Sequence, residues 1–313
     1  SYTGLASYIS TDLHLDKAAL GLLGSAFFYP YAFAQVPWGH LTDRFGGRAV
    51  IAAGLVGVAV LLACFAAAQS LTEAIVWRMA LGIVTACCFT PIAGLLAQWF
   101  APRERGLANG VYHGLGGGLG ESAAFLLMPI LGLYFLQPDP AGEANWRGAT
   151  LFMAGLICSL GGVCWLVLRS KPPASVSQPE PQCEAQPAPR PTSTLASPRA
   201  PLTDPALWLL GIHFAAGIVA LRMVTGWFTI YVTDIYRVQW DSTQATAVIS
   251  AGVIGTIYAI GHIAGSPLIG TLSDRLLPRG LSRPRVAIGW MAVSLVGFLL
   301  LTRPVSSPVW LGL

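Results

Sequence analysis

Long uncharged stretches alternate with short charged loops along the chain. Four of these stretches, 18–42, 49–72, 148–168 and 242–273, contain no Asp, Glu, Lys or Arg. A helix of about 20 residues crosses the roughly 30 Å hydrocarbon core of a membrane, and a buried helix of a soluble protein rarely needs that length. The pattern therefore predicts an all-α, polytopic membrane helix bundle.

Polar breaks divide the chain into successive membrane spans. The residues before 18 look like the outer end of a shortened first span, followed by an external loop that holds Asp12, Asp16 and Lys17. Further spans are predicted at 18–38, 49–69, 73–99, 107–135, 148–168, 206–233, 243–270 and 286–302, and a tenth begins near residue 308. Because the count ends within a span, we expect the natural protein to be longer at both ends.

The composition changes abruptly between the sixth and seventh spans. Residues 170–204 hold nine prolines together with Ser, Ala, Gln and scattered charges, which is typical of a disordered tether. We therefore expect an N-terminal half at 1–169, a Pro-rich linker at 170–204 and a C-terminal half at 205–313. A phosphorylation or partner site in the linker stays open as an alternative, although a plain tether is favoured.

A short charged motif occurs twice, each time at the end of an apolar stretch. The first copy is Gly39-His40-Leu41-Thr42-Asp43-Arg44-Phe45-Gly46-Gly47-Arg48, and the second is Gly270-Thr271-Leu272-Ser273-Asp274-Arg275. Both are predicted to be turns whose carboxylate can pair with an Arg or with the N-terminus of a neighbouring helix. Asp43 and Asp274 are 231 positions apart, so the chain is predicted to contain two related halves. Halves repeated in parallel place a substrate site between them near mid-depth.

The composition agrees with a membrane protein. Of the 313 residues, 54% are hydrophobic and only 10% are charged, against about 25% charged in a soluble domain. The net charge of +4 is dispersed over short loops, which argues against nucleic-acid binding. If both motif copies are cytoplasmic, the loops on that side hold twelve Lys and Arg residues and the other side four, which favours this orientation.

Dedicated chemistry of other kinds is not indicated. The six cysteines lack metal-type spacing, so they are interpreted as small apolar packing residues. No phosphate-binding loop, nucleotide fingerprint or nucleophile elbow is found. We therefore expect no enzyme activity, no cofactor and no metal.

These motifs resemble those of the major facilitator superfamily. The first copy is similar to the family's signature loop after the second span, and the second copy is similar to its counterpart in the second half. Further matches are Arg78-x-x-x-Gly82 in the fourth span, Arg103-Glu104-Arg105-Gly106 before the fifth, and Asn145-Trp146-Arg147 at the entry to the sixth.

The resemblance implies an inner-membrane secondary carrier of alternating access, with twelve spans in two pseudo-symmetric six-helix halves, the second of which is incomplete here. It implies that Asp43 locks against the eleventh helix. It also assigns conformational-switch loops to the following residues: Gly39, Asp43, Arg44, Gly46, Arg48, Gly270, Asp274 and Arg275. The glycines at 114–120 lack the Gly-Pro pairing of the drug and proton antiporter branch, because Pro129 lies too far away. A drug or metabolite exporter is therefore the weaker alternative.

Arg78, Glu121 and Arg222 are ionisable residues inside predicted spans. Each costs at least about 2.5 to 3.5 kcal/mol at mid-bilayer, so each is a functional candidate. With a rise of about 1.5 Å per residue, Arg78 and Glu121 come to similar depth on consecutive helices, so they are predicted to pair. Two interpretations stay open for this pair: an ion pair that stabilises packing, or a carboxylate that carries the coupling proton of a symporter.

Arg222 lies on the predicted seventh span without a carboxylate neighbour in that span. A guanidinium offers two donors in the geometry that a carboxylate or phosphate accepts, which favours an anionic substrate; the alternative is snorkelling to the outer surface. Further polar side chains on or near spans are Tyr29, Tyr31, Gln35, Tyr231, His113, His213 and His262. Tyr29, Gln35, Tyr231 and His213 are kept as substrate candidates, and a packing hydrogen bond is the simpler interpretation for most of the set.

Together these features predict a secondary active transporter of a small solute, with an organic anion favoured, embedded in the lipid bilayer of the cell membrane. Coupling to protons is one of the open alternatives. A carrier-like receptor or assembly protein without transport is the alternative from another class. The costly intramembrane charges argue against it. The substrate, the coupling ion, the direction of transport and the oligomeric state stay open at this point.

Overall fold

A computed structural model describes residues 2–101, 104–135, 145–170, 230–238 and 243–276, together with the single residues 208, 212, 225, 227, 241 and 289. The chain forms two compact units. One comprises Ser1–Lys171 with Thr229–Leu313, and the other comprises Pro172–Phe228. All contacts discussed below lie within the first unit.

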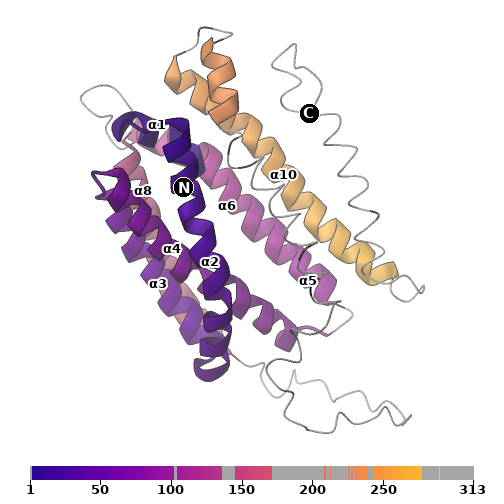
Figure 1. Cartoon of the computed structure of the whole chain (residues 1–313). Coiled ribbons are helices and arrows are strands. Elements are labelled where there is room, and N and C mark those ends of the chain that lie inside the picture. Colours follow the sequence, from indigo (N-terminus) through magenta and orange to yellow (C-terminus); the bar gives the residue numbers. More distant parts are fainter. Residues whose placement is uncertain are drawn as a thin grey trace, which may run out of the picture. The chain divides into compact units, whose positions relative to one another are not determined.

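The described part of this unit is helical throughout (Figure 1). Its helices are α1 (Tyr2–Asp12), α2 (Lys17–Phe45), α3 (Gly47–Ala66), α4 (Leu71–Trp99), α8 (Trp146–Val167) and α10 (Gln244–Leu276). Between α4 and α8 lies the segment Arg105–Tyr134, named span five here. Six of these segments are long and apolar enough to cross a membrane, namely α2, α3, α4, span five, α8 and α10. The predicted all-α membrane bundle is therefore confirmed.

Span five is not a uniform α-helix. Its α-helical pieces are α5 (Arg105–Val111), α6 (Gly118–Ser122) and α7 (Met128–Ile130), and they alternate with the π-helical pieces η1 (Tyr112–Gly117), η2 (Ala123–Leu127) and η3 (Leu131–Phe135). A π-helical turn inserts an extra residue and changes which side chains share a face, and such turns are frequent at functional sites. Sequence alone does not reveal these pieces.

The first motif is mostly helical, contrary to the predicted turn, and the chain turns only at Gly46, between the end of α2 and the start of α3 at Gly47. Helix α2 continues through Asp43 and Arg44 to Phe45 and ends at Gly46, which has a φ of 81°. The second motif likewise forms the last turns of α10, which ends at Leu276. Polar and charged residues do not stop a helix whose backbone hydrogen bonds continue, whereas a positive φ is readily adopted by glycine and ends the helix.

Helix starts follow local capping chemistry. Asp16 accepts a hydrogen bond from the amide of Ala19 at the start of α2. At the start of α4, Ser70 accepts from the amide of Glu73, and the Glu73 carboxylate accepts from the amide of Gln69. This pattern is similar to a capping box, except that the Glu73 carboxylate binds the amide one residue before the N-cap, and it sets where α4 begins.

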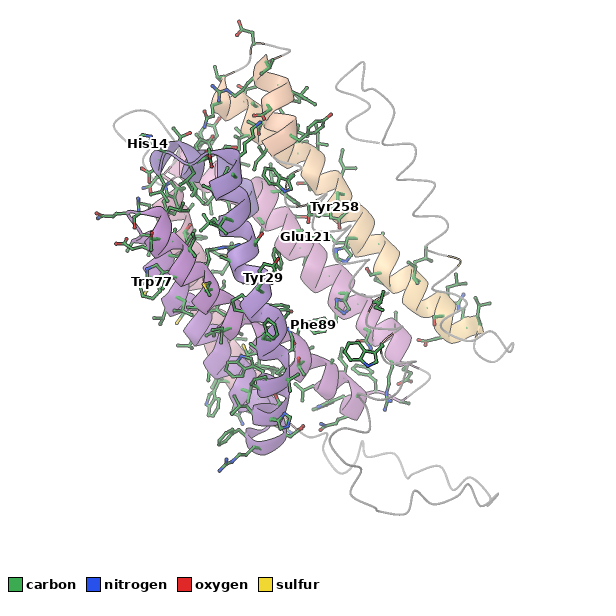
Figure 2. The ribbon with its side chains drawn as sticks, in the orientation of Figure 1. His14, Tyr29, Trp77, Phe89, Glu121 and Tyr258 are labelled. Carbon is green, nitrogen blue, oxygen red and sulfur yellow. The ribbon has the colours of Figure 1, made fainter. Side chains whose placement is uncertain are left out.

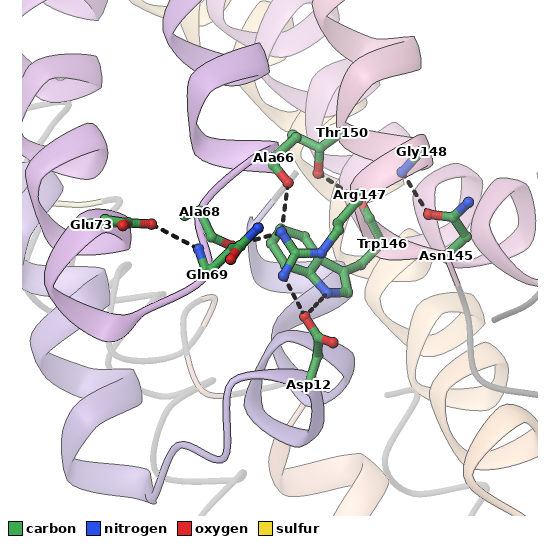
Figure 3. Close-up of polar contacts among 10 residues, drawn as sticks. All are labelled: Asp12, Ala66, Ala68, Gln69, Glu73, Asn145, Trp146, Arg147, Gly148 and Thr150. Atoms are coloured by element: carbon green, nitrogen blue, oxygen red, sulfur yellow. Dashed lines mark hydrogen bonds and ion pairs between the residues drawn. The ribbon is translucent and has the colours of Figure 1, made fainter. Parts of the chain in front are cut away.

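A polar cluster joins the ends of α1, α3 and α8 (Figure 3). The Arg147 guanidinium donates to Asp12 Oδ2 at 2.8 Å and to the carbonyls of Ala66 and Ala68 at 2.8 and 2.6 Å. Trp146 Nε1 also donates to Asp12, at 3.0 Å, and the Arg147 guanidinium lies over the indole ring. Because these carbonyls belong to the C-terminal end of α3, the arginine satisfies groups that the helix leaves unpaired.

The hydrophobic core includes Trp146 and Ala68 of this cluster. It contains Leu5 and Ile9 of α1, Leu23 of α2, Met128 of span five and Val248 of α10, all fully buried. Within the unit, α2 packs against α4, α3 packs against α8 and α4, and α10 packs along span five. Several predicted elements lie outside the described residues, namely nearly all of the linker at 170–204 and most of the spans at 206–233 and 286–302. The division into halves at the linker therefore stays a prediction.

Candidate functional site

Helix α10 runs along span five at close range, and this contact is named the seam here (Figure 1). Span five presents a glycine at every fourth position: Gly106, Gly110, Gly114 and Gly118. A Cβ at Gly110 would lie 2.5 Å from the carbonyl oxygen of Ser266, and one at Gly118 would overlap Ile263. Because only glycine allows the backbones this close, the stripe positions α10 on span five.

Asp274 lies at the cytoplasmic end of the seam, given the predicted orientation. Its Oδ2 accepts a hydrogen bond from the amide of Leu107 at 2.8 Å. Helix α5 has no side-chain cap of its own, so a carboxylate from α10 caps its first turn. A Cβ at Gly106 would collide with this carboxylate. The negative charge at the N-terminus of α5 is favourable because the helix dipole is positive there.

Glu121 and His262 meet farther along the seam. Glu121 Oε2 lies 3.0 Å from His262 Nδ1, and the two side chains are only 20% and 25% exposed. The imidazole lies against span five where Gly117 has no side chain, since a Cβ there would be 2.9 Å from His262 Cε1. Figure 2 shows Glu121 and Tyr258 on these neighbouring helices. At about 1.5 Å per residue, His262 lies about 18 Å from Asp274 along α10, near mid-depth.

The predicted pairing of Glu121 with Arg78 is wrong, because the structure pairs Glu121 with His262. Arg78 lies between α2 and α4, where its Nε donates to the carbonyl of Leu23 at 3.3 Å. Its guanidinium lies over the rings of Phe27 and Phe65, at 5.0 and 6.0 Å from their centroids. The estimated depths were similar, but the two side chains have different environments.

The other polar candidates are dispersed. Gln35 accepts a hydrogen bond from the hydroxyl of Thr90 across the α2–α4 contact. Tyr29, labelled in Figure 2, and Tyr231 are 71% and 56% exposed. His213 and Arg222 lie outside the described residues. Gln35 therefore makes the packing hydrogen bond that was the simpler interpretation for such residues.

His113 and His262 were predicted only as polar side chains on or near spans, and the pairing of His262 with Glu121 was not predicted. His262 is the direct partner of Glu121, and His113 of span five lies against the rings of Phe89 and Tyr112, at 5.8 and 4.9 Å between centroids. His262 lies twelve residues before Asp274, on the helix that carries the repeated motif. This position along the helix was the sequence signal that could have identified it.

The first motif contacts the end of α8. Arg48 Nε donates to the carbonyl of Trp165 at 2.7 Å, and the guanidinium lies 4.7 Å from the centroid of the indole ring. The backbone amide of Arg48 donates to the hydroxyl of Ser170 at 3.3 Å. Arg48 therefore connects the motif to the point where the predicted linker begins.

The remaining motif residues lie at the helix ends. Arg44 lies over the ring of Phe45 at 5.4 Å. Gly39 faces Thr90, and a Cβ at Gly270 would collide with the carbonyl of Gly106. In the part of the chain that the structure describes, Asp43 makes no hydrogen bond or ion pair. Only the second motif's aspartate therefore has a visible helix partner.

Metal binding finds no support in the described residues, where no three His, Cys, Asp or Glu side chains are grouped so that they can hold an ion. Cys87 and Cys88 lie side by side with their sulfurs 3.6 Å apart, and all the cysteines within the described ranges are free thiols. The chemistry available here is therefore that of proton-binding, cationic and aromatic side chains.

Comparison with known proteins gives one consistent family. The family model described as Major Facilitator Superfamily matches residues 1–313. The Nitrate/nitrite transporter NrtP of Picosynechococcus sp. is 30% identical over 184 residues, which cover 53% of this chain and 34% of that protein. The Probable hexose phosphate transport protein of Chlamydia pneumoniae is 24% identical over 88% of this chain and 60% of its own length. The Probable anion transporter 4, chloroplastic, of Arabidopsis thaliana is 24% identical over 95% of this chain and 56% of its own length.

A solved structure shows the same fold. A bacterial homologue of the human lysosomal transporter Spinster, in an inward-facing and unoccupied conformation, aligns with a TM-score of 0.61 at 19% identity. The alignment covers 89% of this chain and 59% of that one. The chain thus spans between about a third and three fifths of the length of the relatives named here.

Proposed function

Because the chain belongs to the Major Facilitator Superfamily, whose model matches its whole length, we propose that it is part of a secondary active transporter that moves a small anion by alternating access. Relatives named as transporters of nitrate and nitrite, of hexose phosphate and of anions support this choice of substrate class. An organic anion, such as a sugar phosphate or a carboxylate, is the narrower form of the proposal.

The observation that carries the proposal is the presence of ionisable side chains within the spans. Arg78, Glu121 and His262 all lie inside apolar helices, where a charge is costly and marks a substrate or ion pathway. Arg78 supplies the positive charge that an anion needs, and Arg222 is proposed to supply a second one from the predicted seventh span. A guanidinium matches a carboxylate or phosphate with two parallel hydrogen bonds.

Proton coupling is the second part of the proposal. In this proposal Glu121 carries the coupling proton, binding it on one side of the membrane and releasing it when the site is exposed to the other side. Moving a proton with an anion also reduces the net charge that crosses the bilayer. The protein would then act as a symporter in the inner membrane, with both motifs and the linker on the cytoplasmic side.

Transport by the full-length protein in liposomes tests this proposal. We would measure uptake of nitrate and of glucose 6-phosphate, with an organic cation as the comparison, with and without an inwardly directed proton gradient. Uptake of either anion, accelerated by the gradient, is expected. Uptake of the cation alone would overturn the anion proposal and favour an exporter of cationic drugs, and uptake of none of the three would favour a receptor or assembly role.

Variants then assign the residues. Replacing Arg78 with Gln is expected to lower the rate of anion uptake by at least about tenfold, because a bidentate, charge-assisted contact is lost. Arg78→Lys should recover only part of this rate, because an ammonium cannot make the bidentate contact. Arg237→Gln is the matched control, because Arg237 is an exposed arginine on the described helix at 230–238. If the Arg78 and Arg237 variants behave alike, Arg78 is not part of the anion site.

A further inference from the structure

The contact between Glu121 and His262 joins two helices that the sequence analysis assigns to different halves. Like the cap that Asp274 places on α5, it is a side-chain hydrogen bond between span five and α10. The rest of the seam consists of glycines and apolar side chains, such as Gly252 against the carbonyl of Phe125 and Gly118 against Ile263. A polar pair therefore lies within an otherwise tightly packed apolar contact.

The protons of this pair can be counted. A carboxylate only accepts hydrogen bonds, so the 3.0 Å contact requires a hydrogen either on His262 Nδ1 or on Glu121 Oε2. A neutral imidazole beside a carboxylate has a net charge of minus one. When the pair binds one more proton, it has no net charge. It is then an imidazolium beside a carboxylate, or equally an imidazole beside a carboxylic acid. When this proton leaves to water, a net charge of minus one remains near mid-depth.

Resting on the proposed function, we propose that Glu121 and His262 together form a proton-operated latch on the seam. With the proton bound, an ion-paired hydrogen bond holds span five against α10. After the proton leaves, the link weakens and the uncompensated carboxylate draws in water, so the seam opens. His262 is thereby a coupling residue that acts with Glu121, and the proton is the ligand of the pair.

The surroundings of the pair favour such a latch. The two π-helical pieces η1 and η2 flank the α6 turn that carries Glu121, and π-helical turns are frequent at functional sites. Small shifts in a tightly packed contact are converted into a change between two discrete arrangements. The glycine stripe provides such a contact, because both backbones approach closely along its length.

Other titratable groups lie on the elements around the pair. In the described residues they include His113 and Tyr112 of span five, Tyr258, Asp274 and Arg275 of α10, Tyr8 and Asp12 of α1, and Cys87, Cys88 and Arg78 of α4. Tyrosine and cysteine ordinarily change charge well above neutrality, and arginine keeps its charge. Histidine changes charge between about pH 5 and 8, so His113 is the competing candidate for the latch.

The latch predicts a pH-dependent distance across the seam, which can be measured without a substrate. Nitroxide labels would replace Leu119 of span five and Ile260 of α10, whose side chains are 60% and 58% exposed, in full-length protein without its native cysteines. In nanodiscs, pulsed electron paramagnetic resonance spectroscopy would measure the distribution of distances between the two labels at several pH values between 5 and 8. We expect the ratio of short to long distances to fall by about tenfold as the pH rises, which is an ordinary coupling strength.

Substitutions identify the groups responsible. His262→Gln and Glu121→Gln keep a hydrogen bond but cannot take up the proton, so each should leave the ratio within about twofold over this range, below an ordinary coupling strength. The double variant Glu121→His with His262→Glu exchanges the two side chains. It should restore the pH dependence if the two single variants lose it because they cannot bind the proton. His14→Asn is the control on the external side, because His14 is exposed and asparagine tolerates its positive φ.

The outcomes separate the latch from the transport proposal. A pH dependence that survives in His262→Gln but disappears in His113→Gln would overturn the latch and assign the proton to His113. A distance independent of pH in the parent protein would also overturn it, even if proton-driven anion uptake is observed. If the parent shows the pH dependence and both Gln variants lose it, the latch stands even when neither nitrate nor glucose 6-phosphate is transported.

Discussion

The two helices that end in the repeated motif, α2 and α10, have similar sequences but different neighbours. With the offset of 231 positions, Gly21, Gly24 and Ser25 of α2 correspond to Gly252, Gly255 and Thr256 of α10. Ser25 and Thr256 even make the same hydrogen bond, from the hydroxyl to the carbonyl four residues before. Helix α10 nevertheless packs on span five, whereas α2 packs on α4. A sequence repeat thus predicts the internal geometry of a helix better than it predicts its partner.

The difference is clearest at the two aspartates. Asp274 caps the first turn of α5, whereas Asp43 has no such contact within the described residues. The glycines differ as well, because four regularly spaced glycines of span five face α10, whereas Gly82 alone of α4 lies against the carbonyl of Phe27 in α2. The seam is therefore a close backbone contact at regularly spaced glycines, with the charged Asp274 at one end. The α2–α4 contact depends more on packing between side chains.

The largest effect is expected from adding a side chain where two helix backbones approach closely. In Gly110→Ala the new Cβ would lie 2.5 Å from Ser266 O and 2.9 Å from the Cα of Pro267, both backbone atoms. Overpacking of this kind costs about 1 to 3 kcal/mol. The midpoint of thermal unfolding in detergent should therefore fall, and Gly82→Ala should behave similarly in the α2–α4 contact.

Matched glycines provide the control for these substitutions. A Cβ at Gly120 of span five or at Gly94 of α4 would meet nothing within 4 Å. Alanine at either position should be neutral or should stabilise by up to about 1 kcal/mol, because it lowers the conformational freedom of the unfolded chain. A loss of stability in Gly120→Ala equal to that of Gly110→Ala would contradict the proposed role of close backbone approach.

The next effect concerns the two aspartates. Asp274→Ala removes the cap of α5 and its interaction with the helix dipole, which together contribute about 0.5 to 2 kcal/mol. Asp274→Asn should lose less, because an asparagine oxygen still accepts from the amide of Leu107. Thermal unfolding monitored by tryptophan fluorescence would measure both losses.

Asp43→Ala sharpens this comparison. The described contacts predict almost no change in the free energy of unfolding, because Asp43 makes no bond there. A loss as large as that of Asp274→Ala would show that Asp43 has a partner outside the described residues. The family resemblance assigns that role to the eleventh helix.

A smaller effect is expected from the arginines of the first motif. Arg48→Ala removes a hydrogen bond to the end of α8 and a cation–π contact, which contribute about 0.5 to 1 kcal/mol at a partly exposed site. Arg44 lies only over its neighbour Phe45, so Arg44→Ala should change stability by less than about 0.5 kcal/mol. Equal effects of the two variants in thermal unfolding would mean that the contact with α8 contributes no stability.

The smallest effect should be the same in both helices. Ser25→Ala and Thr256→Val each remove the hydroxyl that bonds to the preceding turn. The carbonyl that accepts each of these bonds already accepts a backbone hydrogen bond within the helix. The free energy of unfolding of each variant should therefore stay within about 0.5 kcal/mol of that of the parent protein, as measured by thermal unfolding. A larger loss in Thr256→Val alone would indicate that this hydroxyl also contributes to the seam.

The sequence by itself determined the helices, the repeated motif and the family. In a bilayer every backbone hydrogen bond must be satisfied within the segment, so a long uncharged stretch has one structural solution, a helix. The starts of α2 and α4 were also encoded locally, by Asp16 and by the hydrogen bonds of Ser70 and Glu73. These features depend only on residues that are neighbours in the chain.

Only the tertiary structure decided which side chains meet. Glu121 and His262 are 141 positions apart, and Asp274 and Leu107 are 167 apart. Whether such groups meet depends on the rotation and depth of each helix, which are set by packing against other helices and not by local sequence. The π-helical pieces of span five change that rotation again. Equal depth therefore suggested Arg78 as the partner of Glu121, whereas the packing of α10 on the glycine stripe brought His262 to it.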